Sequence, residues 1–157
     1  MYRQLMKPIL FRMDPERAHH VTIGALHTIG KLPGGTSMLS SMYGTSSRPE
    51  LETELWGIRF QHPVGLAAGL DKNGQAVAAF SSVGFGFMEV GTVTPKPQPG
   101  NEQPRLFRLP PDAALINRMG FNNEGAEALA SRLKQIKHRP VPVAVNIGKN
   151  KLRPNEQ

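Results

Sequence analysis

Small, amide-bearing and cationic residues follow three separate apolar runs of the sequence. AAGLDKNG occupies residues 67–74, GTVTP residues 91–95 and NIGKN residues 146–150. Glycine and alanine lack bulk, so a large flat ligand can lie against the backbone there and form hydrogen bonds with it. Lys72, in the first run, would place a cation beside an anionic group of that ligand or of a second one. The pattern therefore indicates a site for a planar molecule and an anion.

Hydrogen-bonding side chains accompany these small residues. Thr92 can donate and accept, and the amides of Asn117 and Asn146 can pair with an imide or amide edge of a ligand. The alternative is that the three runs are ordinary turns without a ligand. One such turn alone favours that alternative, whereas three successive strand ends of this composition favour a ligand site.

The elements that position these residues are predicted from the pattern after residue 60. Apolar strands are expected at 64–69, 87–95 and 141–148, with helices between them. This alternation is typical of a βαβ fold whose strands are buried on both faces. Because ligands bind at the carboxyl ends of strands in barrels and open α/β sheets, the three runs should meet at one edge.

The connecting elements have their own signals. One helix is expected around Ala76, Val77, Phe80 and Val83. Another is expected to be capped by Asn122 or Asn123 and to bear an apolar stripe of Ala126, Leu129, Leu133 and Ile136. LETELW and IRFQH flank Gly57 and predict a hairpin, and RLFRL and ALINR are expected to pair as a flap.

A helical segment precedes this α/β pattern. Asp14 is a suitable N-cap and Pro15 suits the first helical position, and the helix is expected to end at Gly30. Its apolar positions are Ala18, Val21, Ala25 and Ile29. The Gly-, Ser- and Pro-rich stretch 32–50 is expected to be a linker. We therefore expect a helical domain at 1–44 and an α/β domain at 45–157.

Composition excludes several classes of function. The chain of 157 residues has a net charge of +7, which suggests anionic partners or simply a solubility surplus. It contains no cysteine, so a thiolate metal site and a cysteine nucleophile are absent. No apolar run approaches the roughly 20 residues of a membrane-spanning helix. Dinucleotide-binding and P-loop glycine patterns are missing, and His19, His20 and His27 lack the spacing of a metal pair.

Longer motifs resemble one known family. GLAAGLDKNG, GFGFMEVGTVTPKPQPGNEQPRLFRL, INRMGFNNEG and VNIGKNK, with MDPERAHH before them, are similar to segments of the class 2 (quinone-dependent) dihydroorotate dehydrogenases. The resemblance covers almost the whole chain, in order. It implies the N-terminal part of a (β/α)8 TIM barrel, about three of eight strands, preceded by a small helical domain. It also implies FMN-dependent oxidation of dihydroorotate to orotate, with a membrane quinone as electron acceptor, in pyrimidine biosynthesis.

The resemblance also implies roles for individual residues. FMN would contact Ala67, Ala68, Gly69, Lys72, Gly91, Thr92 and Asn146. Dihydroorotate or orotate would contact Lys72, Asn117, Arg118, Met119, Gly120 and Phe121. His19 and Arg108 would line a quinone tunnel, and no metal is expected.

Three further expectations follow from this resemblance. The catalytic base of the family is a serine on a loop expected beyond Gln157, so the chain is expected to lack activity without the C-terminal half of the barrel. Without a presequence or a spanning segment, it is expected on the cytoplasmic face of a bacterial inner membrane, held by an anionic surface. The alternative is a non-catalytic, basic α/β fragment that binds nucleic acid or phosphorylated ligands; the first reading expects no nucleic acid.

Overall fold

A parallel sheet of three strands lies at the centre of the structure, a computed structural model that describes residues 2–46, 48–136 and 139–154. The strands pair in the order β3-β4-β7 and comprise Gly65–Leu66, Phe87–Val93 and Val143–Ile147. Both pairings are parallel. The predicted βαβ order is therefore confirmed.

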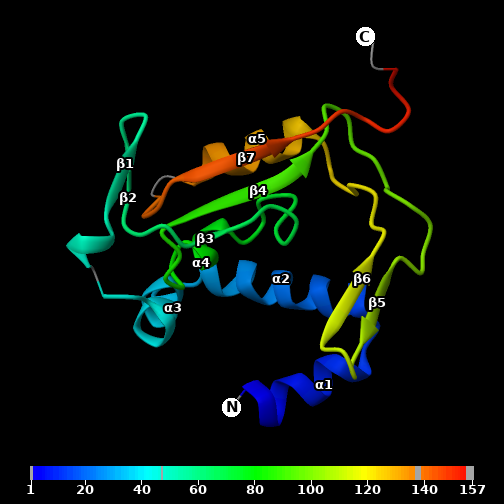
Figure 1. Ribbon diagram of the computed structural model, residues 1–157, viewed down its shortest axis with the longest axis horizontal. Helices are drawn as coiled ribbons and strands as arrows, with labels where there is room; N and C mark the ends of the chain where they lie inside the picture. The colour runs from blue at the N-terminus through cyan, green and yellow to red at the C-terminus, as the bar shows by residue number, and fades with distance from the viewer. Residues whose placement is uncertain (1, 47, 137–138, 155–157) are drawn as a thin grey trace.

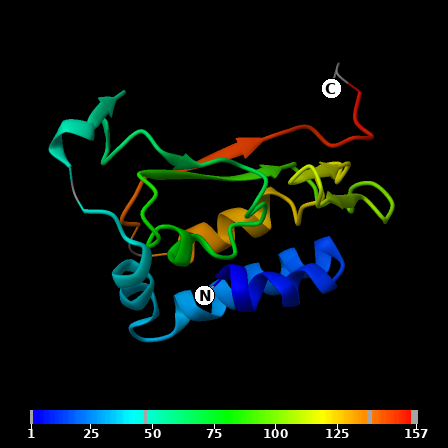
Figure 2. The same ribbon diagram turned by 60° about the horizontal axis from the view of Figure 1, so that its bottom comes forward.

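Helices cover one face of this sheet (Figures 1 and 2). The covering helices are α2 (Pro15–Lys31), α4 (Val77–Phe80) and α5 (Ala126–Gln135). The N-terminal segment also contains η1 (Tyr2–Met6), α1 (Lys7–Arg12) and α3 (Gly35–Tyr43). All of the parallel strands run from the α3 side of the molecule toward the side that carries β5 and β6 (Figure 1).

Two antiparallel pairs complete the described structure, and both were predicted. β1 (Thr53–Leu55) and β2 (Ile58–Phe60) form the hairpin around Gly57, preceded by η2 (Pro49–Leu51). β5 (Leu106–Leu109) and β6 (Ala114–Asn117) form the flap.

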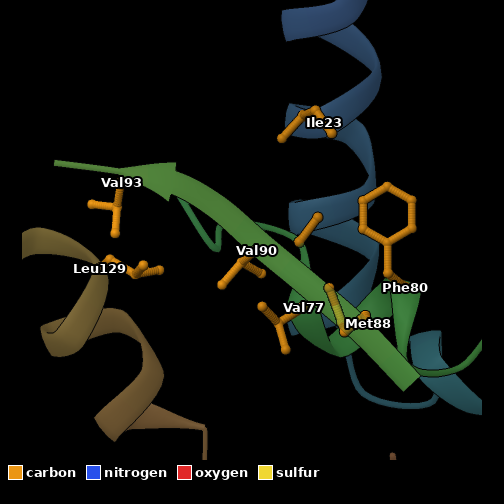
Figure 3. Packing of buried hydrophobic residues seen from close by; sticks show 8 residues of the cluster. Ile23, Val77, Phe80, Met88, Val90, Val93 and Leu129 are labelled. Carbon is orange, nitrogen blue, oxygen red and sulfur yellow. The ribbon is translucent and has the colours of Figure 1, made fainter. Parts of the chain in front are cut away.

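The hydrophobic core lies between the sheet and the three covering helices (Figure 3). Met88 and Val90 of β4 point into it and are fully buried, as is Val77 of α4, and Leu129 of α5 is buried beside them. Ile23 of α2 belongs to the same cluster. Because each such side chain contributes about 1.5–3 kcal/mol on burial, the core fixes which face of β4 is turned away from the helices.

Helix α2 begins as predicted but buries only part of its predicted apolar stripe. The Asp14 carboxylate accepts a hydrogen bond from the backbone N–H of Arg17 at 3.0 Å, which is the expected N-cap. Of the predicted apolar positions, Ala18 is buried and Val21 and Ala25 are exposed, whereas Ile23, which was not among them, is buried. The helix packs closely against α4 at Gly30, where a Cβ would lie 3.3 Å from the backbone nitrogen of Ala79.

The stretch 32–50, predicted to be a linker, contains the helix α3. Gly34 precedes it in a left-handed conformation with φ of 76°, which glycine adopts without strain. Leu39 is buried, so tertiary packing stabilises a helix that composition did not predict.

Several other predicted boundaries were wrong. Neither Asn122 nor Asn123 is the N-cap of α5, which is Gly125; instead the Asn123 side-chain oxygen accepts hydrogen bonds from the N–H groups of Gly125 and Thr94. Ala126 is exposed. β3 and α4 are shorter than predicted because the Asp71 carboxylate accepts hydrogen bonds from Gln75 and Ala76 and holds the chain in a turn between them.

The prediction that all three strands are buried on both faces was also wrong for β7. Its residues are half-buried or exposed, and Ile147 is 77% exposed. Among the described residues, β4 is the sole strand paired with β7, so its outer edge has no neighbour.

A buried ion pair joins α2 to the segment that leads into the flap. Glu16 and Arg105 are both almost inaccessible, and the guanidinium donates hydrogen bonds to both carboxylate oxygens. Arg105 also donates to the carbonyl oxygens of Pro99 and Asn101 at 2.6 and 2.8 Å. The hydrogen bond from Arg105 holds the pKa of Glu16 below its ordinary value of 4.5, and the same bond raises the pKa of Arg105.

Replacing Glu16 by glutamine should lower the free energy of unfolding of the chain by about 3 kcal/mol at neutral pH, because a buried guanidinium loses its counter-charge. Since the pKa of Glu16 is depressed in the folded state, its contribution is present above pH 4.5 and is lost as the pH falls through the folded pKa. Urea unfolding as a function of pH measures this.

The matched control is Glu54→Gln, because Glu54 lies exposed on β1. The difference in stability between wild type and Glu16→Gln should shrink in acid, whereas Glu54→Gln should change little at any pH. A difference that stays constant in acid would contradict the role assigned to this ion pair.

Candidate functional site

A cleft of about 540 Å³ lies at the carboxyl ends of β3 and β4. Three parts of the chain line it: α2, the strand ends, and the flap with the segments before and after it. Its lining residues are His19, Ala68, Gly69, Leu70, Lys72, Thr92, Asn101, Leu106, Leu115, Asn117, Arg118, Met119, Gly120 and Phe121. Volume does not distinguish this cleft, because a cavity of about 500 Å³ also lies between α2, α4 and α5. What distinguishes this cleft is that most of the predicted site residues line it.

Backbone hydrogen bonds tie the three strand ends together. The Gly69 N–H donates to the Gly91 carbonyl oxygen at 2.8 Å, and the Gly148 N–H donates to the Val93 carbonyl oxygen at 2.9 Å. A Cβ at Gly91 would lie 2.5 Å from the Asn146 carbonyl oxygen, and its φ is 108°, so glycine is required there. The prediction that the three ends meet at one edge is confirmed.

Open space lies over the first strand end. Gly69 has a φ of 110°, and a Cβ built on it would meet no heavy atom within 4 Å. Ala68 and Thr92 also line the cleft. The residues present therefore fit a flat group such as a flavin, because bare backbone and a hydroxyl are available along one surface.

An acidic side chain connects the strand ends on the face opposite the core. The Glu89 carboxylate accepts hydrogen bonds from the Asn146 side-chain amide at 3.1 Å and from the Ala68 N–H at 3.4 Å. The Thr92 hydroxyl donates to the Asn146 side-chain oxygen at 2.6 Å. Glu89 was not predicted from the sequence, where the available signal is one acidic residue within the apolar run FMEV.

Lys72 brings a partly desolvated cation into the cleft. Its ammonium group donates to the Gly69 carbonyl oxygen at 2.8 Å. Burial lowers the pKa of Lys72, and Arg105 lowers it further, while Glu16 opposes both. Burial also lowers the pKa of His19, and the Lys72 charge lowers it further. An anion entering the cleft would relieve this repulsion, so the site favours an acidic ligand.

The flap brings the side-chain amide of Asn117 to the cleft. Asn117 ends β6, and its backbone is paired with Leu106 of β5. The Arg118 guanidinium donates to the Pro104 carbonyl oxygen at 2.9 Å and lies over the Phe107 ring, so it holds the flap together. Met119 is buried, whereas Phe121 is 58% exposed.

Four predicted site residues are not among those that line the cleft. Ala67 is exposed beside it, Gly91 is buried under it, and Asn146 lies behind Thr92. Arg108 points toward the end of α1, where it donates to the carbonyl oxygens of Leu10 and Met13. Its guanidinium also lies 4.7 Å from the centre of the Phe11 ring.

The described residues offer neither a cluster of metal ligands nor a membrane-spanning helix. No group of three or more His, Cys, Asp or Glu side chains in that part of the chain could hold a metal ion. Within the same residues, no helix has the length and apolarity needed to cross a membrane.

The sheet order, the covering helices and the strand-end cleft are those of part of an α/β barrel. The sequence profile described as dihydroorotate dehydrogenase matches residues 50–157. The chain is 60% identical to the dihydroorotate dehydrogenase (quinone) of Deinococcus deserti over 152 residues, covering 97% of this chain and 42% of that protein. It is 52% identical to the protein of the same name from Acidithiobacillus ferrooxidans, covering 98% and 42%.

A solved structure supports the same assignment. The structure of DHODH in complex with ferulenol from Eimeria tenella matches with a TM-score of 0.74 and 44% identity, over 90% of this chain and 38% of that chain. The chain belongs to the dihydroorotate dehydrogenase family. It spans about two fifths of the length of these relatives.

Replacing Lys72 by methionine should raise the pKa of His19, because the positive charge of Lys72 disfavours the imidazolium. The pKa should stay below 6.5, because burial of the ring persists. A proton NMR titration of the His19 ring measures this. Lys134→Met, on the exposed surface of α5, is the control and should leave the titration unchanged. A His19 pKa that falls or does not move in Lys72→Met would contradict the assigned coupling.

Proposed function

We propose that this chain forms the N-terminal part of an FMN-dependent, quinone-linked dihydroorotate dehydrogenase that serves pyrimidine biosynthesis. The observation that carries the proposal is the meeting of bare strand ends, Lys72 and the flap amide Asn117 in one cleft. The 60% identity to a relative named for this activity supports it.

In this proposal the strand ends hold FMN. The residues proposed to contact it are Ala68, Gly69, Lys72 and Thr92, which line the cleft, together with the adjacent Ala67, Gly91 and Asn146. FMN, when bound, would supply a hydride acceptor, which protein side chains do not provide. The open space over Gly69 and the hydroxyl of Thr92 in the cleft support this placement.

The opposite wall of the cleft is proposed to hold dihydroorotate and orotate. The Lys72 ammonium group would pair with the substrate carboxylate, since a desolvated cation gains most from an anionic partner. The Asn117 amide would pair with the imide edge. Arg118, Met119, Gly120 and Phe121 would shape the rest of the wall, and Arg118 already fixes the flap backbone.

The catalytic base is proposed to come from the portion of the relatives that lies beyond the match. The family resemblance places a serine there, and Ser81 is unsuitable because it is buried against Met88. The C-terminal half of the barrel is therefore a proposed partner of residues 45–157, and the chain by itself should not turn over substrate.

Residues 1–44 are proposed to associate with an anionic membrane surface. In η1 and α1 the exposed apolar side chains are Leu5, Met6, Ile9 and Phe11, and α3 exposes Met38, Met42 and Tyr43. Lys7 lies among them, with its ammonium group 5.0 Å from the centre of the Phe11 ring. An apolar surface with cations suits a protein lying on the cytoplasmic face of a bacterial inner membrane.

The quinone is proposed to reach the cleft between the N-terminal helices and the flap. His19 lines the cleft from α2, and Arg108 holds the end of α1 against the flap. This arrangement would bring an apolar electron acceptor from the membrane to the flavin.

The test uses a fusion protein, in which this chain is joined to the part of the Deinococcus deserti relative beyond the match. It should bind about one FMN per chain and oxidise dihydroorotate with a quinone. Lys72→Met should weaken orotate binding by about tenfold or more while the protein stays folded, because a charge-assisted contact is lost. Lys134→Met should resemble the unsubstituted fusion protein.

Two outcomes would contradict the proposed function. One is a folded fusion protein that takes up no FMN. The other is tight, steeply salt-dependent binding of DNA or RNA by a flavin-free protein, which would favour the basic binding fragment instead.

A second test removes residues 1–13 from the fusion protein, which leaves α2 and its core residue Ile23 in place. Turnover with a membrane quinone should fall by about tenfold or more, whereas reduction of a soluble dye should change little, because the dye does not need the apolar surface. Steady-state rates with both acceptors measure this. Equal losses with the two acceptors would refute the role given to the N-terminal helices.

A further inference from the structure

Glu89 is the single acidic residue of β4, and it points away from the core. The neighbouring side chains Met88 and Val90 are fully buried against the helices, so alternation along the strand turns Glu89 to the opposite face. The register of β4 and β7 shifts between Val90 and Val93. Beyond this irregularity, Thr92 reaches the same polar cluster as Glu89.

The carboxylate of Glu89 determines how the Asn146 amide is oriented. An ionised carboxylate only accepts hydrogen bonds, so the group facing it must be the amide NH2 of Asn146, at 3.1 Å. The amide oxygen of Asn146 then faces Thr92. A hydroxyl that meets this oxygen at 2.6 Å must donate to it.

The orientation of Asn146 in turn determines what Thr92 offers to the cleft. Because its one proton is given to Asn146, the Thr92 oxygen has only lone pairs left for a ligand. Thr92 lines the cleft, so it presents an acceptor there. The second oxygen of Glu89 accepts the Ala68 N–H at 3.4 Å, which fixes the backbone of the first strand end as well.

We propose that Glu89 is a positioning residue that fixes Asn146, Thr92 and the Ala68 backbone for the bound cofactor without touching it. The inference rests on the proposed function for the identity of that cofactor. The orientation of Asn146 is independent of the proposed function, because it is a property of the ligand-free protein. A glutamine at this position keeps the shape but lets either side-chain atom face Asn146, so the direction of hydrogen bonding is no longer set.

The first experiment needs no flavin. The ligand-free fusion protein is labelled at asparagine with a nitrogen isotope, and the side-chain amide signal of Asn146 is identified by its loss in Asn146→Ala. Glu89→Gln should shift this signal and speed its exchange with solvent, whereas Glu54→Gln should leave it in place. An unshifted Asn146 signal in Glu89→Gln would overturn the inference, whether or not the protein binds FMN.

The second experiment measures FMN affinity of the fusion protein by titration. Glu89→Gln should weaken it by about tenfold, Glu89→Asp should restore most of the loss, and Glu54→Gln should have no effect. In an Asn146→Ala background, Glu89→Gln should cause little further loss, because both act through one contact. Wild-type affinity in Glu89→Gln, or losses that multiply in the double variant, would overturn the positioning role. Loss of FMN binding by the unsubstituted protein would instead count against the proposed function.

Discussion

Parallel pairing of three short strands is the constraint on which the rest of the structure depends. Parallel strands place their carboxyl ends at one edge, so residues far apart in the sequence meet there. In this chain the Gly69 N–H donates to the Gly91 carbonyl oxygen at that edge, and the absence of a side chain at Gly91 lets the Asn146 backbone of β7 approach closely. The cleft therefore follows from strand direction and one close backbone approach.

The two faces of β4 carry side chains of different kinds. Met88 and Val90 anchor the strand to the helices, and Glu89 and Thr92 lie in the polar cluster at the strand ends. Since the core side is filled by closely packed side chains, the strand cannot rotate or slip by one residue without burying Glu89. The rigidity that orients the polar side is thus supplied by the apolar side.

Local signals allowed much of this fold to be predicted from the sequence. The Asp14 cap, the hairpin, the flap and the strand order depend on residues close together or on simple alternation, and all were confirmed. The helix α3 and the burial of Ile23 in α2 were missed, because Leu39 and Ile23 are selected by contacts with distant elements. Glu89 was missed for the same reason, since its partners Ala68 and Asn146 lie in two other parts of the chain.

Arg108 attaches the flap to the end of α1. Its guanidinium donates hydrogen bonds to carbonyl oxygens at the end of that helix, while its backbone pairs with Leu115 in the flap. The neighbouring strand ends at Asn117, inside the cleft. The two strands of the flap therefore bridge the end of α1, which Arg108 contacts, and the cleft, which Asn117 lines.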